Sequence, residues 1–281
     1  DYQQIISMSQ PPTDAIDGPN DSPALTRVAN DGMARICREH PDRMPWFIAS
    51  LPMNNTAAAV AEVDRVIDEH NAVGFQLFTN VNNKALDQPE FRDIFAKIAE
   101  RGKIIWLHPT RPATHPDYLT EDRSFYEIFW GFGWAYETSV AMARIVCSGM
   151  FDEIPDLKII AHHWGAYAPH AEGRFTPAWE SRNAVMGDEQ GFAGKLKKPL
   201  VDYFKKDFYG DTAMFGAQAA SQAGFDFFGA DHSVFATDAP YDHEGGAYNI
   251  RSTLEVLKNL RCTDDDRQMI FEDNARRLFG I

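Results

Sequence analysis

The chain has 281 residues, 44% of them hydrophobic, so it can bury the core of one large α/β domain. Its 27 Lys and Arg against 41 Asp and Glu give a net charge of −14, which argues against general binding to nucleic acid or to anionic membranes. A local arginine or a metal ion can still make one pocket attractive to an anionic substrate.

The cysteines and the apolar runs indicate the cellular compartment of the protein. Cys37, Cys147 and Cys262 are scattered and form no CxxC spacing, which fits a reducing compartment. No apolar run reaches the ~20 residues that cross a bilayer, and no signal-peptide pattern is visible at the start. We therefore expect a cytoplasmic protein without a membrane partner.

The first half of the chain alternates short apolar strands with helical patterns. Strands are predicted over residues 4–8, 46–51, 74–79 and 104–108, and helices over residues 23–40, 55–70 and 91–102. Asp21 and Ser22 can cap the first helix, and Gly102 ends the third. Several of these strands are apolar without alternation, which is typical of parallel strands buried on both faces.

The second half continues the same pattern after a long aromatic segment over residues 116–150, whose part 137–150 is predicted to be helical. Further strands are predicted over residues 157–162, 208–211 and 232–237, followed by helices over residues 248–260 and 264–278. The alternation indicates an α/β fold, and the lack of a GxGxxG turn argues against a dinucleotide-binding sheet.

Seven predicted strands are one fewer than a (β/α)8 TIM barrel needs. Because the sequence opens almost directly in a strand, we expect the missing eighth strand to be the first strand of the barrel. We expect its gap to be filled by another segment, by dimer contacts or by a shift of neighbouring elements, since open strand edges are a liability. No linker or repeat divides the sequence, so residues 1–281 are predicted to form a single domain.

Polar residues stand at the ends of three well-separated strands. His108 follows residues 104–107, His162 follows residues 157–161, and Asp238 follows residues 233–237. In an α/β barrel the carboxyl ends of the strands meet on one face, where barrel enzymes keep their chemistry. Two imidazoles and a carboxylate at that face predict a metal-dependent active site.

Short motifs in the same regions carry a family resemblance. They are Leu51-Pro52-Met53, Trp106-Leu107-His108-Pro109, Tyr136-Glu137-Thr138, Phe151 through Ile160 leading into Ala161-His162-His163, Glu172-Gly173-Arg174, Thr237-Asp238 and Asn274-Ala275-Arg276-Arg277-Leu278-Phe279. Their order, over nearly the whole chain, resembles the amidohydrolase-2 family, which includes aminocarboxymuconate-semialdehyde decarboxylase and the resorcylate decarboxylases.

The resemblance implies a TIM barrel of the metal-dependent hydrolase type that holds one divalent metal, with zinc expected before manganese. It implies His108 and Asp238 as metal ligands and His162 as the catalytic imidazole. Either Asp238 or His162 is expected to protonate the substrate, so Asp238 is a candidate catalytic residue too. The family's first strand supplies a further His-x-His or Glu-x-His pair, for which this sequence offers no candidate. With the two remaining ligands we expect weak or absent metal binding.

Each of these residues also has a simpler interpretation. A histidine such as His108 at a strand end is often a hydrogen-bonded structural residue. Asp238 can merely cap the turn before Pro240. His162 and His163 are adjacent, so on a strand they would point to opposite faces, and His163 would then serve helix packing.

Four side chains are candidates for substrate binding. Arg174 and Arg182 offer planar forks that suit a carboxylate, although both can equally be solvated. In the related decarboxylase whose spacing fits best, an arginine at the Arg182 position reaches the neighbouring subunit's site, which implies a homodimer or higher homo-oligomer. Asn80 can line the pocket and Tyr241 can hydrogen-bond a substrate, while Asp211 can orient a ligand.

An aromatic cluster interrupts the second half of the chain. It comprises Phe125, Tyr126, Phe129, Trp130, Phe132 and Trp134. We expect most of these side chains to pack in the core, with some covering the site or forming a dimer surface.

The leading hypothesis is a metal-dependent, non-oxidative decarboxylase of a small aromatic or dienoic carboxylic acid. The first alternative is a metal-dependent hydrolase of an amide, ester or lactone on the same fold, because strand ends alone do not separate the two chemistries. The second alternative is an inactive barrel remnant that serves as an oligomeric scaffold.

Overall fold

The structure is a computed structural model that describes residues 2–186 and 196–281. Internal contacts divide the chain into two compact units, the first made of Asp1–Thr110 and Glu153–Ile159, the second of Arg111–Asp152 and Ile160–Ile281. The single-domain expectation and the expected absence of a first strand stay predictions. Among the described residues, no helix combines the length and apolar character needed to span a bilayer.

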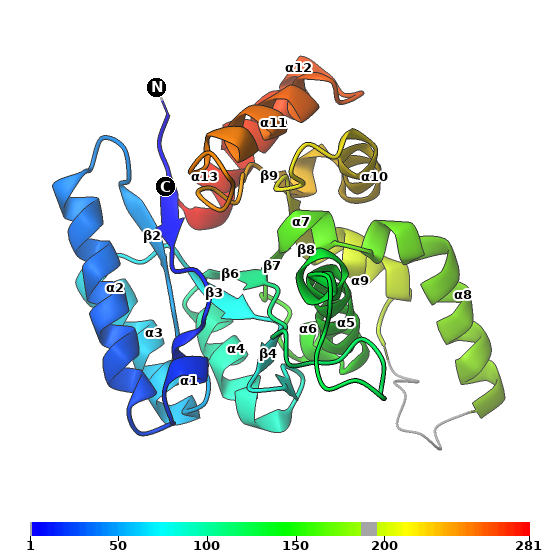
Figure 1. Ribbon diagram of the computed structural model, residues 1–281, viewed down its shortest axis with the longest axis horizontal. Coiled ribbons are helices and arrows are strands. Elements are labelled where there is room, and N and C mark those ends of the chain that lie inside the picture. The colour runs from blue at the N-terminus through cyan, green and yellow to red at the C-terminus, as the bar shows by residue number, and fades with distance from the viewer. Residues whose placement is uncertain (1, 187–195) are drawn as a thin grey trace. The chain divides into compact units, whose positions relative to one another are not determined.

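The first unit is a parallel sheet with helical connections (Figure 1). Its strands pair in the order β1 (Ile5–Ser7), β2 (Trp46–Ala49), β3 (Gly74–Phe78) and β6 (Ile104–His108). Its helices are α1 (Thr13–Ile16), α2 (Ser22–Glu39), α3 (Thr56–His70), η1 (Pro89–Phe91) and α4 (Arg92–Glu100). A small antiparallel hairpin, β4 (Asn80–Val81) and β5 (Lys84–Ala85), follows β3.

The core of this unit explains the apolar strands. Every residue of β3 is buried, with Phe75 0% and Leu77 1% exposed, and α2 and α4 pack against the neighbouring strands β2 and β6. Helix α3 turns Val63 and Val66 inward, α2 packs against α3, and α3 packs against α4. The prediction of buried parallel strands is therefore confirmed.

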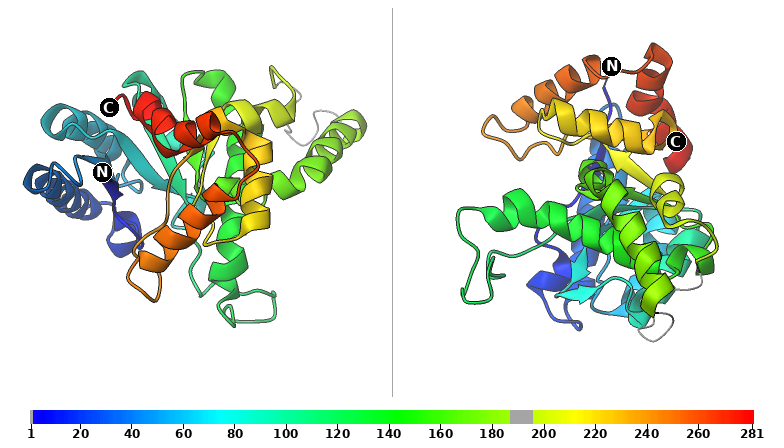
Figure 2. Two further views of the ribbon diagram at one scale, coloured as in Figure 1. Left: turned by 90° about the horizontal axis from the view of Figure 1, so that it is seen from above. Right: turned by 90° about the vertical axis from the view of Figure 1, so that its right-hand side faces the viewer.

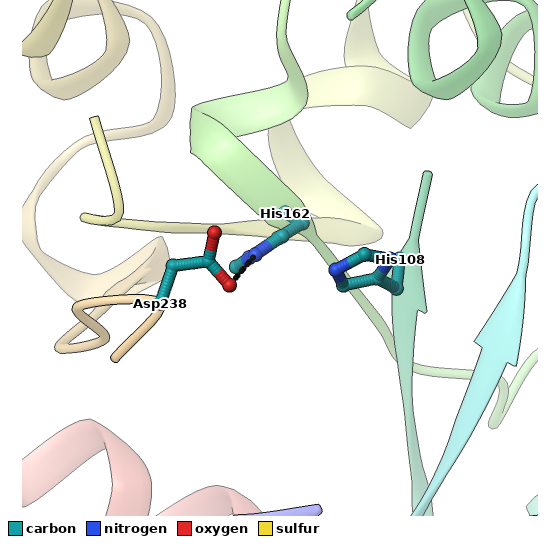
Figure 3. A group of neighbouring side chains, drawn as sticks. All are labelled: His108, His162 and Asp238. Carbon is teal, nitrogen blue, oxygen red and sulfur yellow. Dashed lines mark hydrogen bonds and ion pairs between the residues drawn. The ribbon is translucent and has the colours of Figure 1, made fainter. Parts of the chain in front are cut away.

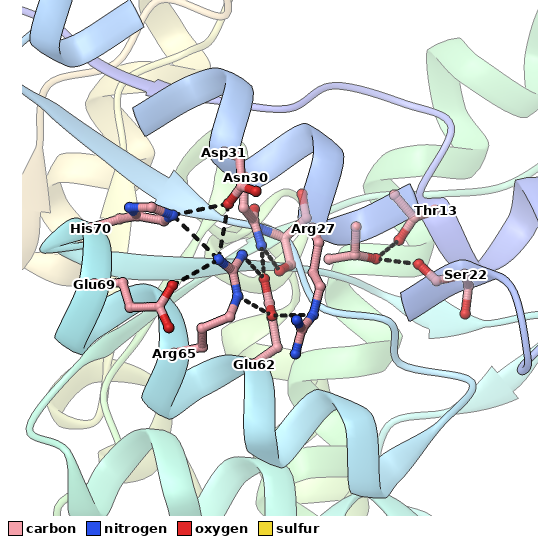
Figure 4. A network of polar contacts seen from close by, with 11 residues as sticks. Thr13, Ser22, Arg27, Asn30, Asp31, Glu62, Arg65, Glu69 and His70 are labelled. Carbon is pink, nitrogen blue, oxygen red and sulfur yellow. Dashed lines mark hydrogen bonds and ion pairs between the residues drawn. The ribbon is translucent and has the colours of Figure 1, made fainter. Parts of the chain in front are cut away.

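A buried polar network ties the end of β2 to two helices (Figure 4). Asn30 of α2, 0% exposed, donates from Nδ2 to the Ser50 carbonyl oxygen at 3.0 Å and to Glu62 Oε1 of α3 at 2.8 Å. The Ser50 amide donates back to Asn30 Oδ1 at 2.9 Å. Arg65 pairs with the buried Glu62 carboxylate at 2.7 Å. The network thereby fixes the loop that leaves β2.

Replacing Asn30 with Leu should destabilise the protein by about 3 kcal/mol. The Ser50 amide would lose its acceptor, and the buried Glu62 carboxylate would lose one of its donors. Urea unfolding of the two proteins measures this difference. Asn20→Leu, at an exposed position, is the matched control and should change little. Equal effects of the two substitutions would contradict the structural role of Asn30.

The second unit holds the remaining elements. Strand β7 (Ile159–Ala161) starts in the first unit and ends here, where it is followed by β8 (Phe208–Asp211) and β9 (Ser233–Val234), and β8 and β9 are parallel. The helices are η2 (Phe129–Gly133), α5 (Trp134–Cys147), α6 (Met150–Glu153), α7 (His162–Gly165), α8 (Ala168–Met186), α9 (Leu200–Lys206), α10 (Gln218–Phe228), η4 (Ala230–His232), α11 (Ala247–Lys258), α12 (Asp264–Gln268), η5 (Met269–Asp273) and α13 (Asn274–Phe279).

Two predicted elements differ from those observed in the second unit. Strand β9 is shorter than the strand predicted over residues 232–237. The Phe235 amide donates to the Ile270 carbonyl oxygen at 2.9 Å and so does not take part in the hydrogen bonding between strands. The predicted helix over residues 264–278 is interrupted by the π-helical turn η5. Helices α8, α9 and α10 were not predicted.

The aromatic segment lies largely on the surface. Residues 111–128 project beyond α5 (Figure 2), and Phe125, Trp130 and Phe132 are 43%, 50% and 67% exposed. The expectation of core packing is wrong for these three side chains, because they occupy a loop and the turn η2 rather than the buried face of a helix. Large exposed apolar groups of this kind are typical of contact surfaces.

Asp14 in α1 is a buried acid in the first unit, with only 5% of the residue exposed. Burial raises the pKa of Asp14 to about 6, against a smaller lowering by its own backbone amide. Between pH 3.8, the ordinary pKa, and about 6 the unfolded chain ionises while the folded chain keeps the proton. The stability of the protein should therefore fall across this window as pH rises, by about 3 kcal/mol for this group.

Asp14→Asn should remove this loss, so the variant should gain stability relative to the wild type between pH 4 and pH 7. Urea unfolding at both pH values measures the gain. Asp17→Asn, at an exposed position three residues along the chain, is the control and should show no comparable gain. An identical pH dependence for wild type and Asp14→Asn would refute the assignment.

Candidate active site

The segment after β7 forms a tight turn rather than a continued strand. His162 begins α7, and His163 and Trp164 have φ values of 55° and 47°, in the left-handed region. The two imidazole rings consequently stack, with centroids 3.9 Å apart and planes 29° apart. The prediction that they point to opposite faces is wrong, because it assumed extended backbone at both residues.

Trp164 anchors this turn in the core. Its side chain is 1% exposed, and Nε1 donates to Ser233 Oγ at 3.1 Å. Gly210 of β8 and Gly224 of α10 leave room for the indole. A Cβ atom at Gly224 would lie 2.5 Å from Trp164 Cγ, and a Cβ atom at Gly210 would clash with the same ring. The two glycines therefore allow the backbone conformation that presents His162.

Asp211, at the end of β8, holds His162 from one side. Its Oδ2 accepts a hydrogen bond from His162 Nδ1. Its Oδ1 accepts from the backbone amides of His163 at 2.9 Å and Ala213 at 3.2 Å. Asp211 is fully buried, so these contacts fix both the ring and the turn that carries it.

Asp238 meets the opposite nitrogen of the same ring (Figure 3). Its Oδ1 lies 3.5 Å from His162 Nε2, and its backbone has a φ of 57°. Burial disfavours the charged imidazole, but the Asp211 and Asp238 carboxylates outweigh it and raise the pKa of His162 above its ordinary value. Burial and the neighbouring His162 lower the pKa of His163. The pair thus contains one proton-rich and one neutral imidazole.

His162, His163 and Asp211 form a cluster of potential metal ligands in the second unit, and hydrogen bonds hold this cluster together. Ligand atoms of His162, His163 and Asp211 lie within 4.8 Å of one another. However, His162 Nδ1 donates to Asp211 and His163 Nδ1 donates to the Ala213 carbonyl oxygen. Both δ nitrogens therefore act as donors, which suits a structural network better than metal coordination.

His108 ends β6 in the first unit (Figure 3). Its Nδ1 lies 2.7 Å from the Pro109 carbonyl oxygen, which can only accept, so Nδ1 carries a proton and, in the neutral ring, Nε2 carries the lone pair. The ring packs against Phe78 with centroids 5.4 Å apart. A backbone carbonyl on one nitrogen and a lone pair on the other is the arrangement seen in metal-binding histidines.

Of the predicted substrate-binding residues, Asn80 belongs to the first unit, and Arg174, Arg182 and Tyr241 belong to the second. Asn80 donates to the Thr110 carbonyl oxygen and accepts from the Asn83 amide, both at 3.0 Å, so its side chain serves its own loop. Tyr241 is 60% exposed, and Arg174 is exposed on α8. Arg182 belongs to the same helix, but its side chain lies outside the described residues.

Parallel strands that end in imidazole and carboxylate side chains define a class of α/β enzymes with a His/Asp site at the strand ends. Residues 7–281 match the Amidohydrolase family, described as Amidohydro_2, and the chain belongs to this family. The resemblance drawn from the motifs is thereby confirmed.

Decarboxylases are among the proteins to which this chain is similar. The gamma-resorcylate decarboxylase of Rhizobium sp. (strain MTP-10005) is 31% identical over 293 residues, which cover 99% of this chain and 82% of that protein. The solved structure of 5-carboxyvanillate decarboxylase from Sphingomonas paucimobilis is 25% identical, with a TM-score of 0.85 over 99% of this chain and 79% of that one.

A further solved structure carries a metal. The dihydroxybenzoic acid decarboxylase from Polaromonas sp. JS666, with bound manganese and the inhibitor 2-nitroresorcinol, is 26% identical. Its TM-score is 0.80, covering 99% of this chain and 81% of that one. These likenesses confirm the predicted α/β class and the amidohydrolase fold.

Proposed function

We propose that this protein is a metal-dependent, non-oxidative decarboxylase of an aromatic or dienoic carboxylic acid on a (β/α)8 TIM barrel. The observation that carries the proposal is His162, buried between the Asp211 and Asp238 carboxylates with Nε2 directed at Asp238. A buried imidazole kept proton-rich by two carboxylates suits delivery of a proton to carbon. The 31% identity to a decarboxylase supports the same chemistry.

His108 and Asp238 would hold the metal. An imidazole nitrogen and a carboxylate oxygen suit zinc or manganese, and the His108 tautomer presents Nε2 for coordination. When bound, the metal would supply a Lewis acid that stabilises negative charge on the substrate.

His162 donates its Nε2 proton to the ring carbon that bears the carboxylate, with Asp238 as the alternative donor. A C–H bond forms, the C–C bond to the carboxylate breaks, and its electron pair restores conjugation as CO2 leaves. Asp211 keeps the proton at Nδ1, so the mobile proton of the ring is the one at Nε2.

The remaining substrate contacts are also proposals. Arg174 and Arg182 would bind a carboxylate through bidentate hydrogen bonds, and Tyr241 and Asn80 would contact the ring's substituents. We further propose a homodimer in which the exposed aromatic side chains of residues 125–136 lie in the contact surface. Light scattering on the purified protein should give twice the 31.7 kDa chain mass, and a monomer at working concentration would contradict it.

A product assay tests the reaction. Incubation with 2,6-dihydroxybenzoate should release resorcinol and CO2 or bicarbonate without consuming oxygen. A new acid formed by uptake of water from an ester, amide or lactone, with no CO2 from any aromatic acid, would instead establish a hydrolase.

Removal of the metal should abolish turnover. Dialysis against a chelator should lower the rate by at least about 10²-fold, and added Mn²⁺ or Zn²⁺ should restore it. His108→Ala and Asp238→Ala should each lower the metal content measured by elemental analysis. Full activity in protein shown to be free of metal would contradict the proposed role of the ion.

A further inference from the structure

The first unit contains a small cavity beyond the carboxyl ends of three neighbouring strands. Its volume is about 10 Å³, enough for one water-sized group. Its walls include Met8 and Ser9 after β1, Ser50 and Leu51 after β2, Phe78 at the end of β3 and Asn80 after it. His108 ends the next strand, β6, and its backbone pairs in register with Phe78. The cavity therefore lies at the same strand-end edge of the sheet as His108.

Asp14 is the acid of this cavity. The residue is 5% exposed and lines the wall together with Thr13. Among the described residues, no side chain donates a hydrogen bond to its carboxylate, which accepts from its own backbone amide. A buried carboxylate with so few donors is costly, since buried charges are ordinarily paired or hydrogen-bonded.

Three other polar groups in the wall are already used by the chain. Thr13 Oγ1 pairs with Thr26 Oγ1 at 2.7 Å, and Gln76 Nε2 donates to the Met8 carbonyl oxygen. Asn80 donates to the Thr110 carbonyl oxygen and accepts from the Asn83 amide. The cavity thus offers the Asp14 carboxylate as an acceptor to an incoming group. Thr13, Gln76 and Asn80 compete little for it, because they donate to other atoms of the chain.

We propose that this cavity is a subsite for one uncharged hydrogen-bond donor of the substrate, a ring hydroxyl or amino group, with the Asp14 carboxylate as its acceptor. The proposal rests on the proposed function and narrows the substrate class to acids that carry such a substituent. A second carboxylate at the same ring position is rejected, because two like charges would share a buried site. A methoxy group is rejected because it has no proton to donate and exceeds one water-sized volume.

The test compares binding of matched ligands at pH 8, where Asp14 is ionised. Dissociation constants are measured by calorimetry for 2-, 3- and 4-hydroxybenzoate, their methoxy counterparts and the corresponding benzenedicarboxylates. At one ring position the wild type should prefer hydroxyl over methoxy and over carboxylate by about tenfold or more. Asp14→Leu should abolish that preference, and the isosteric Asp14→Asn should reduce it if Asp14→Leu does not fold. Asp17→Leu, at an exposed position, should retain it.

The outcomes separate this subsite from the proposed reaction. A preference that survives both Asp14 variants, or its absence in the wild type at every ring position, overturns the subsite. Turnover of an aromatic acid without an Asp14-dependent preference overturns the subsite alone. An Asp14-dependent binding preference without turnover of any acid supports the subsite and counts against the decarboxylase.

Discussion

His162→Asn should reduce decarboxylation by about 10²- to 10⁴-fold while the protein remains folded. The asparagine side chain cannot deliver a proton from the position of Nε2, although it can still hydrogen-bond to Asp211. Single-turnover rates with 2,6-dihydroxybenzoate measure the loss, and circular dichroism with urea unfolding checks the fold. An unchanged rate would remove His162 from the mechanism.

His163→Asn is the matched control for this experiment. His163 stacks on the same ring but directs Nδ1 to the Ala213 carbonyl oxygen, so we expect a loss at least tenfold smaller than for His162→Asn. A larger loss of rate for His163→Asn than for His162→Asn would mean that His163, and not His162, donates the proton.

Asp211→Asn should lower the rate by at least about 10²-fold, because His162 loses a carboxylate that keeps its ring protonated. The asparagine can keep its oxygen on the amides of His163 and Ala213, so its NH2 group would then face His162 Nδ1. Because an NH2 group only donates, a neutral imidazole must move its proton from Nδ1 to Nε2. The ring would keep its place and a proton at Nε2, but as a neutral imidazole it would be a much weaker acid than the protonated ring and would deliver that proton less readily.

Nitrogen-15 NMR of histidine-labelled protein reports the tautomer directly, and the single-turnover rate reports its consequence. Asp207→Asn is the control, because Asp207 pairs with Lys198 and does not contact His162. An Asp211→Asn protein in which His162 stays protonated as in the wild type but the rate is fully lost would show that Asp211 acts in another way.

The strand ends were predictable because they depend on local patterns. Apolar runs that stop at His108, His162 and Asp238 can be identified without any knowledge of distant contacts, and β6, β7 and β9 stand close to where those runs predict them. The family resemblance rests on the same residues. These parts of the site are encoded by neighbouring residues in the chain.

The turn after β7 was missed because its cause is not local. His163 and Trp164 adopt left-handed backbone conformations only because Gly210 and Gly224, far along the sequence, make room for the indole. Helix α10 was missed for a related reason, since its buried face includes the small residues Ser221 and Gly224 rather than an apolar stripe.

The burial of Asp14 was also beyond local patterns. An aspartate after two prolines is typical of an exposed turn, yet Asp14 is 5% exposed in α1. The loops after β1, β2 and β3 enclose it, and their positions depend on the whole sheet. Burial of a single polar residue in a short helix leaves no periodic signal in the sequence.

The packing of the Trp164 indole makes the turn that carries His162 less tolerant of mutation than the loops around Asp14. A side chain larger than hydrogen at Gly210 or Gly224 would disturb the turn that presents His162, so the proton-delivering part can vary little. The loops after β1, β2 and β3 belong to the first unit, and a single substitution there can change the size or charge of the cavity around Asp14. New substrate preferences should therefore arise by mutation of these loops, while the segment around His162 stays fixed across descendants of this protein.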